Sequence, residues 1–247
     1  MPTRAEVLRE LGLAPEWRLR RSATASASVG APSANDRPAG DARPESSRLA
    51  RIAALDWERF AADVDACTAC GLCRTRHRSV PGVGDIHAQW MLIGEAPGAE
   101  EDARGEPFVG QAGRLLDNML ASLGMNRREN VYIANVLKCR PPGNRTPEPL
   151  EVEACRPYLE RQVALIRPRL ILALGKSAAS LLLGTDASIA SLRGRVHRFR
   201  DVPLVVTYHP AYLLRSLQDK AKAWEDLLLA RRTLATVSSG ALPGVDG

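Results

Sequence analysis

The chain has 247 residues and a formal net charge of +6 at pH 7, and all but four of its 34 basic residues are arginine. This length supports a buried core, whereas no stretch approaches the run of about 18 apolar residues that a membrane span needs, and no apolar signal segment begins the chain. We therefore expect a soluble, cytoplasmic protein, and the arginine excess favours a polyanionic partner, although a genomic bias toward arginine would give the same count.

Two segments precede the part of the chain whose apolar pattern predicts a globular domain. Residues 1–20 predict a short helix, and both a frayed tail and an arm that docks an unknown protein fit it. Residues 21–48 are rich in Ala, Ser, Pro and Gly and cannot bury enough apolar surface to offset the entropy of ordering, so they predict a flexible linker. With a disordered tail expected at 239–247, residues 51–238 form the one expected domain.

Short apolar runs alternate with helical stretches inside this domain. Length and apolar continuity predict buried strands in four ranges, which are 90–96, 131–138, 170–175 and 204–210. Helix-like spacing is found in four further ranges, which are 113–124, 147–168, 175–184 and about 218–237. This alternation predicts an α/β protein of three layers, α/β/α, with a central, mainly parallel, four-stranded sheet. Pro157 is expected to kink the second helix or to begin a new one.

Polar segments follow three of the predicted strands. GEAPGAEED follows the first strand, KCRPPGNRTP follows the second, and YHPAYLLR lies at the end of the fourth. Ligands bind beyond the carboxyl ends of the strands in sheets of this kind. We therefore expect the three segments to form one site.

The cysteines form a second group. Cys67, Cys70 and Cys73 stand in a C-x2-C-x2-C run, and Cys139 and Cys155 follow much later in the chain. An odd number of cysteines in a reducing compartment argues against disulfides and favours a metal site. Four thiolates from two segments suit a tetrahedral zinc ion and a four-iron cluster equally, so spacing leaves the metal open.

Several ordered motifs carry a resemblance. GEAPGAEEDARGEPFVGQAGRLLDNML, NVLKCRPPGNRTPEPLEVEAC and HPAYLLR, with the paired cysteines upstream, resemble the family 4 uracil-DNA glycosylases, the iron-sulfur branch of the uracil-DNA glycosylase superfamily. The resemblance covers about residues 60–235. It implies the fold of that superfamily and a monomeric enzyme that flips uracil out of single- or double-stranded DNA. The enzyme would hydrolyse the N-glycosidic bond, leave an abasic site and initiate base excision repair, without cleaving the strand.

The same resemblance selects iron-sulfur and implies a 4Fe-4S cluster. Its expected ligands are four of the five cysteines, namely Cys67, Cys70, Cys139 and Cys155. Cys73 is expected to be a spare buried thiol, because the fourth cysteine of a ferredoxin-type run does not follow it. We expect the cluster to be structural, since hydrolysis needs no electron transfer.

Three side chains fit the work of a uracil pocket. The Asn135 amide offers a donor and an acceptor, which match uracil O4 and N3–H and mismatch cytosine. The resemblance implies that Phe108 stacks on the flipped base, and a His209 imidazole that donates to uracil O2 would stabilise the departing anion. Each has an alternative interpretation. Asn135 would be a strand-end amide bonded to its own backbone, Phe108 would serve ordinary core packing, and His209 would be a loop histidine.

The remaining pocket residues follow from the acidic segment and the last motif. Glu95 is the first choice to position or polarise water, and Ala96 stands where the best-known branch of the superfamily carries an aspartate. Glu101 is expected to close the pocket near uracil C5 and exclude the methyl group of thymine, because Gly98 replaces the bulky residue that does so elsewhere. Leu213 matches the position that wedges into the gap left by the flipped nucleotide, although simple core packing also explains it.

Other charged residues are expected to serve DNA binding or to be solvated. Backbone amides of APG and PPGNR would grip phosphates together with Arg140 and Arg145, and residues 193–200 predict a solvated hairpin. Glu100 and Asp102 are expected to be solvated charges at a helix start.

Two alternative functions remain. Some relatives trap uracil covalently through a histidine in a basic insert after the second strand, and KCRPPGNRTP contains no histidine. The other alternative is a non-catalytic iron-sulfur module that binds DNA or senses redox state, in which replacement of Asn135 or His209 would leave DNA binding unchanged.

Overall fold

The computed structural model describes residues 44–239, and the predictions for residues 1–43 and 240–247 lie outside the described residues. The described chain begins with helix α2 (Pro44–Ala53) and continues with α3 (Trp57–Asp65). The last five residues of the expected linker are therefore helical. Proline suits the first position of a helix, and Glu45 in the first turn favours the helix dipole, so the globular part begins before residue 51.

A mixed six-stranded sheet forms the centre of the molecule, with the strand order β1-β3-β2-β4-β6-β5. The four inner strands are parallel, and they are β2 (Trp90–Gly94), β3 (Val131–Asn135), β4 (Leu170–Leu174) and β6 (Val202–Thr207). The two edge strands, β1 (Val83–Gly84) and β5 (Val196–Phe199), are antiparallel to their neighbours. The prediction of four strands was wrong because it missed the two edge strands. These strands are short and only partly buried, so the sequence shows no continuous apolar run for them.

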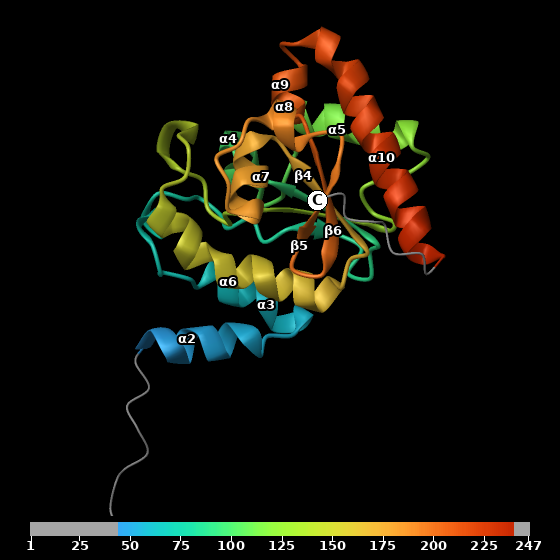
Figure 1. The fold of residues 1–247 in the computed structure, drawn as a ribbon. Coiled ribbons are helices and arrows are strands. Elements are labelled where there is room, and N and C mark those ends of the chain that lie inside the picture. The colour runs from blue at the N-terminus through green and yellow to red at the C-terminus, as the bar shows by residue number, and fades with distance from the viewer. Residues whose placement is uncertain (1–43, 240–247) are drawn as a thin grey trace, which may run out of the picture. The chain divides into compact units, whose positions relative to one another are not determined.

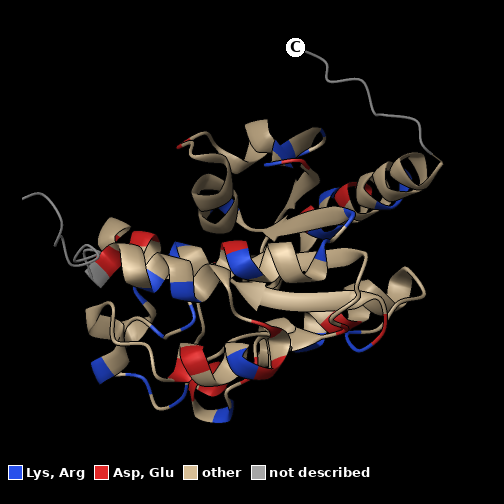
Figure 2. Ribbon diagram, turned by 90° about the horizontal axis from the view of Figure 1, so that it is seen from below, with Lys and Arg blue, Asp and Glu red and all other residues tan. Residues whose placement is uncertain are grey.

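Helices cover both faces of the sheet (Figure 1). One face packs against α6 (Pro149–Ile166), α7 (Lys176–Leu183) and α8 (Ile189–Leu192). The other face packs against α5 (Gln111–Ser122) and α10 (Lys220–Ser238). Every residue of β2, β3 and β4 is buried, which explains why these strands read as unbroken apolar runs. Figure 2 shows the charged residues on the helices and loops that surround them.

Helix α6 also carries a small second core on its outer side. Ile52 of α2, Leu55 of the following turn, and Phe60 and Val64 of α3 pack around Tyr158 of α6. Helix α6 is one continuous helix through Pro157, so no new helix begins there. The second core fixes the chain just before the cysteine run, which lies in the turn after α3 and in the short 3-10 helix η1 (Gly71–Arg74).

The remaining short elements belong to the segments that leave the carboxyl ends of the parallel strands. They are α4 (Ala99–Arg104) after β2, η2 (Pro142–Asn144) after β3, and α9 (Pro210–Leu213) and η3 (Leu217–Asp219) after β6. In the range 44–239, no helix is both long and apolar enough to cross a membrane.

Candidate active site

A cavity of about 540 Å³ opens at the carboxyl edge of the parallel strands. Its lining comes from the three predicted segments together with α4 and the start of α5, and it comprises Glu95, Ala96, Pro97, Gly98, Glu101, Phe108, Ala112, Asn135, Pro141, Asn144, Arg145, His209, Ala211 and Arg215. The expectation that the three polar segments form one site is therefore met by the geometry, because adjacent parallel strands end at the same edge.

Asn135 is the last residue of β3 and points its amide into this cavity. The residue is only 2% exposed, and its side chain makes no hydrogen bond to another residue between 44 and 239. The interpretation of an amide bonded to its own backbone is therefore wrong. A Cβ atom at the neighbouring Gly94 would lie 2.4 Å from Asn135 Oδ1 and 2.8 Å from Phe108 Cζ, so only glycine leaves room for both side chains.

His209 caps the start of α9 and has a defined tautomer. Its Nδ1 atom accepts a hydrogen bond of 3.1 Å from the Ala211 backbone N–H, so a neutral ring carries its proton on Nε2. Burial lowers the pKa of His209 from 6.5 to about 4; the Glu101 carboxylate opposes this change and the Arg215 cation adds to it. At neutral pH the cavity therefore contains an uncharged imidazole with one N–H donor.

This pKa shift predicts a stability change with pH. The unfolded chain takes up the His209 proton near pH 6.5 and the folded chain near pH 4, so the free energy of unfolding falls as the pH is lowered through this window, by about 3 kcal/mol in total. His209→Asn keeps an acceptor for the Ala211 N–H but cannot titrate. In urea unfolding between pH 7 and pH 4, we expect the variant to lose less stability than the wild type, and parallel curves would contradict the assigned shift.

Phe108 forms one wall of the cavity. Its ring is 5% exposed and stacks on the His209 ring with a centroid distance of 5.5 Å and an angle of 30°. The residue also packs on the side of the sheet that α5 and α10 cover, so it belongs to the core and to the cavity wall at once. The stacked pair of rings therefore forms an aromatic part of the cavity wall.

The two candidate glutamates have different surroundings. The Glu95 carboxylate makes no hydrogen bond within the described part of the chain and lines the cavity just after β2. The Glu101 carboxylate instead accepts backbone N–H groups from Gly98 at 3.1 Å, Val109 at 3.0 Å and Gly110 at 3.3 Å. Glu101 therefore ties the start of α4 to the loop before α5, and these two segments form the lip of the cavity, while Glu95 is available to a ligand.

Asp102 was predicted to be solvated, and that prediction was wrong. It is 1% exposed and accepts hydrogen bonds from the backbone N–H of His77 at 2.9 Å and from its Nδ1 at 2.6 Å. The two residues are 25 positions apart, so local pattern gave no sign of the contact. The pair connects α4, which carries the cavity lip, to the segment that follows the cysteine run.

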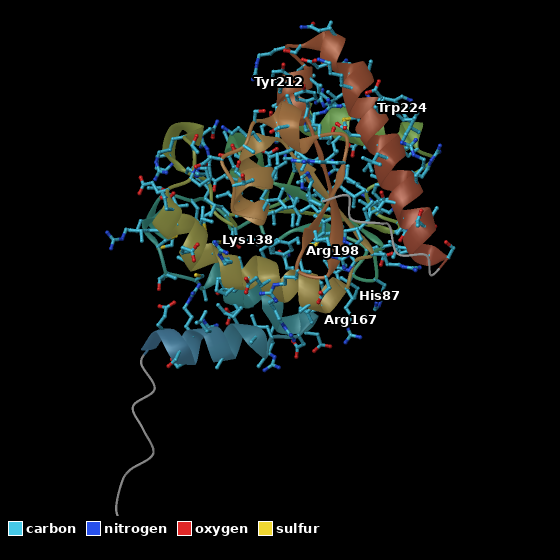
Figure 3. All side chains as sticks on the ribbon, viewed as in Figure 1. His87, Lys138, Arg167, Arg198, Tyr212 and Trp224 are labelled. Carbon is cyan, nitrogen blue, oxygen red and sulfur yellow. The ribbon has the colours of Figure 1, made fainter. Side chains whose placement is uncertain are left out.

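Leu213 does not reach the protein surface, which agrees with the alternative interpretation of simple core packing and not with a wedge that is already exposed. It is 1% exposed and packs against Tyr208 and Ala223, whereas Leu214 is 42% exposed and Leu217 is 63% exposed. The reason is helical geometry, because the fourth residue after His209 returns to the inward face of α9 and the next residue turns outward by about 100°. Tyr212 marks this end of the molecule in Figure 3.

The arginines near the cavity differ from the prediction in one respect. Arg145 lines the cavity but forms a two-pronged ion pair with Glu151, at 2.6 and 2.9 Å. Arg140 donates to Asn144 Oδ1 at 2.7 Å. Arg215, which sequence reasoning missed, lines the cavity and makes no ion pair with another residue of the range 44–239. Its only sequence signal is its place in the motif HPAYLLR.

The cysteines line a separate, small cavity of about 20 Å³ between η1, α6 and the loop after β3. All five thiols contribute to this lining, namely Cys67, Cys70, Cys73, Cys139 and Cys155. Within residues 44–239, no group of three or more His, Cys, Asp or Glu side chains is placed to hold a single metal ion.

Hydrogen-bond donors and positive charge surround three of these sulfurs. Arg76 Nη1 donates to Cys139 Sγ at 2.9 Å, Arg48 Nη2 lies 3.9 Å from Cys67 Sγ, and the backbone N–H of Lys138 donates to Cys155 Sγ at 3.3 Å.

Burial raises the pKa of the Cys155 thiol to about 12 and lowers the pKa of the fully buried Lys138 ammonium to about 8. The buried cation lies close to α6 (Figure 3) and opposes the first effect, because it favours the thiolate. The donor set therefore fits a cluster of net negative charge.

Comparisons with known proteins agree with the site. A family model described as the uracil DNA glycosylase superfamily matches residues 81–228. The chain is 47% identical over 160 residues to the type-4 uracil-DNA glycosylase of Archaeoglobus fulgidus, a match that covers 62% of this chain and 80% of the relative. It is 42% identical to the type-4 enzyme of Pyrobaculum aerophilum, with 71% and 93% covered, and 44% identical to that of Thermotoga maritima, with 64% and 83% covered.

Proposed function

The chain belongs to the uracil DNA glycosylase superfamily and within it to the type-4 uracil-DNA glycosylases, and from this premise we propose how its cavity releases uracil from DNA. The protein is a hydrolase of DNA repair that cleaves the bond between uracil and deoxyribose. One observation supports the proposed mechanism above all. Asn135, Phe108 and His209, from three separate segments, line the same cavity with their hydrogen-bonding groups or ring faces toward it.

Asn135 and Phe108 recognise the base. A base inside a duplex is out of reach, so the nucleotide is flipped into the cavity at a cost of a few kcal/mol. The Asn135 amide then donates to uracil O4 and accepts from N3–H, and it has no competing partner within the described chain. Cytosine presents the opposite pattern at these two atoms, so it leaves the buried amide unpaired and is rejected.

Stabilisation of the leaving group falls to His209. Its Nε2–H donates to uracil O2, and this hydrogen bond strengthens as negative charge develops on the departing base. The Ala211 N–H holds Nδ1, so the donor is already oriented before the bond breaks. Because the pKa of His209 is about 4, the imidazole stays neutral and acts as a hydrogen-bond donor, without transfer of its proton.

Water is positioned by Glu95, whose carboxylate makes no hydrogen bond to another described residue and lines the cavity beside Ala96. A carboxylate at this place polarises the attacking water and stabilises the positive sugar ring by charge. Glu101 has a steric task. Its bonds to Gly98, Val109 and Gly110 hold the lip of the cavity in place, and the lip then limits the space near uracil C5 that the methyl group of thymine would need.

The cysteine cavity is proposed to hold a 4Fe-4S cluster through Cys67, Cys70, Cys139 and Cys155. When bound, the cluster supplies a covalent crosslink between the segment after α3 and the segments that flank η2. Cys73 lines the same cavity, yet no hydrogen-bond donor to its sulfur is seen in residues 44–239, in contrast to Cys67, Cys139 and Cys155 and to Cys70, which receives the backbone N–H of Leu72. We therefore assign Cys73 no ligand role.

This assignment predicts different effects for two cysteine variants. Cys139→Ser is expected to lose most of the broad absorbance near about 400 nm that iron-sulfur proteins show, together with most of the bound iron and sulfide. Cys73→Ser is the matched control and should retain all three. Equal losses in both variants would make Cys73 a ligand, and a colourless wild-type protein that contains zinc would overturn the cluster itself.

The exposed residues after His209 are proposed to contact the DNA. Leu214, the residue directly after α9, takes over the wedge role first expected at Leu213, because it is 42% exposed and its neighbour Arg215 lines the cavity. Arg215 lines the cavity mouth as a cation without an ion-pair partner in residues 44–239, so it suits a backbone phosphate. Arg145 is held by Glu151 and contributes less charge to this grip.

Release of uracil tests the mechanism directly. A labelled oligonucleotide with a single uracil is incubated with the protein, once as a single strand and once paired with guanine. We expect free uracil and an abasic site in both cases. DNA binding without any release would instead support a non-catalytic module, and a DNA–protein adduct that survives denaturation would support a uracil-trapping protein.

A further inference from the structure

Phe108 adopts a backbone conformation that aromatic residues rarely adopt. Its φ angle is +54°, in the left-handed region that favours glycine. Such a conformation persists only where the surrounding structure holds it in place. The structure must therefore contain groups that fix the backbone of residue 108, and those groups also fix the direction of its ring.

Arg127 supplies the main polar contacts to this backbone. Its Nη2 atom donates to the Phe108 carbonyl oxygen at 2.8 Å, and its Nη1 atom lies 3.3 Å from the Pro107 carbonyl oxygen. The guanidinium is itself held by Asp117 of α5, which accepts from Nε at 2.7 Å, and lies 3.5 Å from Glu106. One partly buried guanidinium thus connects α5 to two successive carbonyls of the cavity loop.

Gly113 of α5 also lies close to the same carbonyl. A Cβ atom at this position would lie 1.7 Å from the Phe108 carbonyl oxygen, so α5 approaches the loop as closely as a backbone can. The Phe108 carbonyl is therefore confined between α5 and the Arg127 guanidinium. Arg127 itself does not line the cavity, and its side chain is only 16% exposed.

We propose that Arg127 is a positioning residue for uracil release, which acts by holding Phe108 in the left-handed conformation that directs its ring toward His209. The inference rests on the proposed stacking of uracil on Phe108. Without the guanidinium, the Phe108 carbonyl loses its donor and the residue relaxes toward a negative φ. The ring then turns away from the plane that aligns uracil with Asn135 and His209, and the aligned geometry is lost.

The test is a comparison of Arg127→Gln with Arg128→Gln, its exposed neighbour. We expect Arg127→Gln to lower kcat about tenfold on a single-stranded uracil substrate with little change in KM, because DNA affinity depends mainly on phosphate contacts. Arg128→Gln should match the wild type. In a Phe108→Ala background the Arg127→Gln change should cost less than twofold in kcat, since the ring through which Arg127 acts is absent.

Arg127→Lys keeps a cation near Asp117 but cannot donate to both carbonyls, and it should show an intermediate kcat. If Arg127→Gln does not fold, Arg127→Lys takes its place in the comparison with Arg128→Gln. The inference is overturned if kcat of the Arg127 variants equals that of Arg128→Gln, or if Arg127→Gln lowers kcat equally with and without the Phe108 ring. If Phe108→Ala itself leaves kcat unchanged, the stacking proposal fails as well; if it lowers kcat while the Arg127 variants do not, only the present inference fails.

Discussion

Replacement of His209 by alanine is expected to lower kcat for uracil release by about 10²- to 10³-fold. That is the usual effect of removing one preorganised donor from a developing negative charge. The structure gives the reason for an effect of this size. The imidazole is nearly buried and neutral, with a pKa of about 4, and its orientation is set by the Ala211 N–H. Water that enters in its place would have to be oriented during the reaction, so the stabilisation of the uracil anion is lost.

Single-turnover measurements of uracil release would give this effect without interference from product release. His87→Ala is the matched control, because His87 is exposed and lies at the end of the molecule opposite Tyr212 (Figure 3). His209→Ala should bind abasic DNA with nearly wild-type affinity. A loss of kcat below tenfold would mean that His209 is not the main donor to the leaving base.

Replacement of Asn135 by alanine is expected to lower kcat/KM by about 10²-fold or more. The variant leaves uracil O4 and N3–H without partners at a position where Asn135 itself is only 2% exposed. Two unmade hydrogen bonds in such a site cost about 1–3 kcal/mol each. The folded structure should change little, because the Asn135 side chain bonds no residue between 44 and 239 and only its backbone carbonyl holds Lys138 Nζ, at 2.7 Å.

Asn118→Ala is a suitable comparison for this variant, since Asn118 lies on the exposed side of α5 and does not line the active-site cavity. Competition by free uracil gives a second readout, and its inhibition should weaken in Asn135→Ala and remain unchanged in Asn118→Ala. Unchanged inhibition together with unchanged kcat/KM would remove Asn135 from base recognition.

The sequence alone was sufficient for the parallel strands and for the edge of the sheet at which the cavity opens. Strands β2, β3 and β4 are buried along their whole length, so each appears as an unbroken apolar run. The polar segments after them could then be assigned to one sheet edge, because the carboxyl ends of parallel strands share an edge. Asn135 and His209 were predicted as site residues from motifs in these segments, and the cavity lining includes both.

The direction of side chains outside the regular strands was decided by the tertiary structure. Leu213 and Leu214 are neighbours of the same type, and only the packing of α9 against Tyr208 and Ala223 buries the first and exposes the second. The sequence predicted that Asp102 is a solvated charge, whereas in the structure it accepts hydrogen bonds from His77. A periodic apolar pattern predicts which face of a helix is buried only if the pattern repeats along the helix. A helix of four residues, such as α9, is too short to show a repeat.

The contacts that hold the site together join residues far apart in the chain, and local sequence carries no sign of them. Arg127 meets the Phe108 carbonyl across 19 positions, and Arg76 meets the Cys139 sulfur across 63. The sequence thus determined which chemical groups the protein has at the ends of its strands. Only the fold decided which of them are buried, paired or free for a ligand, because burial and charge pairing depend on neighbours that come from other segments.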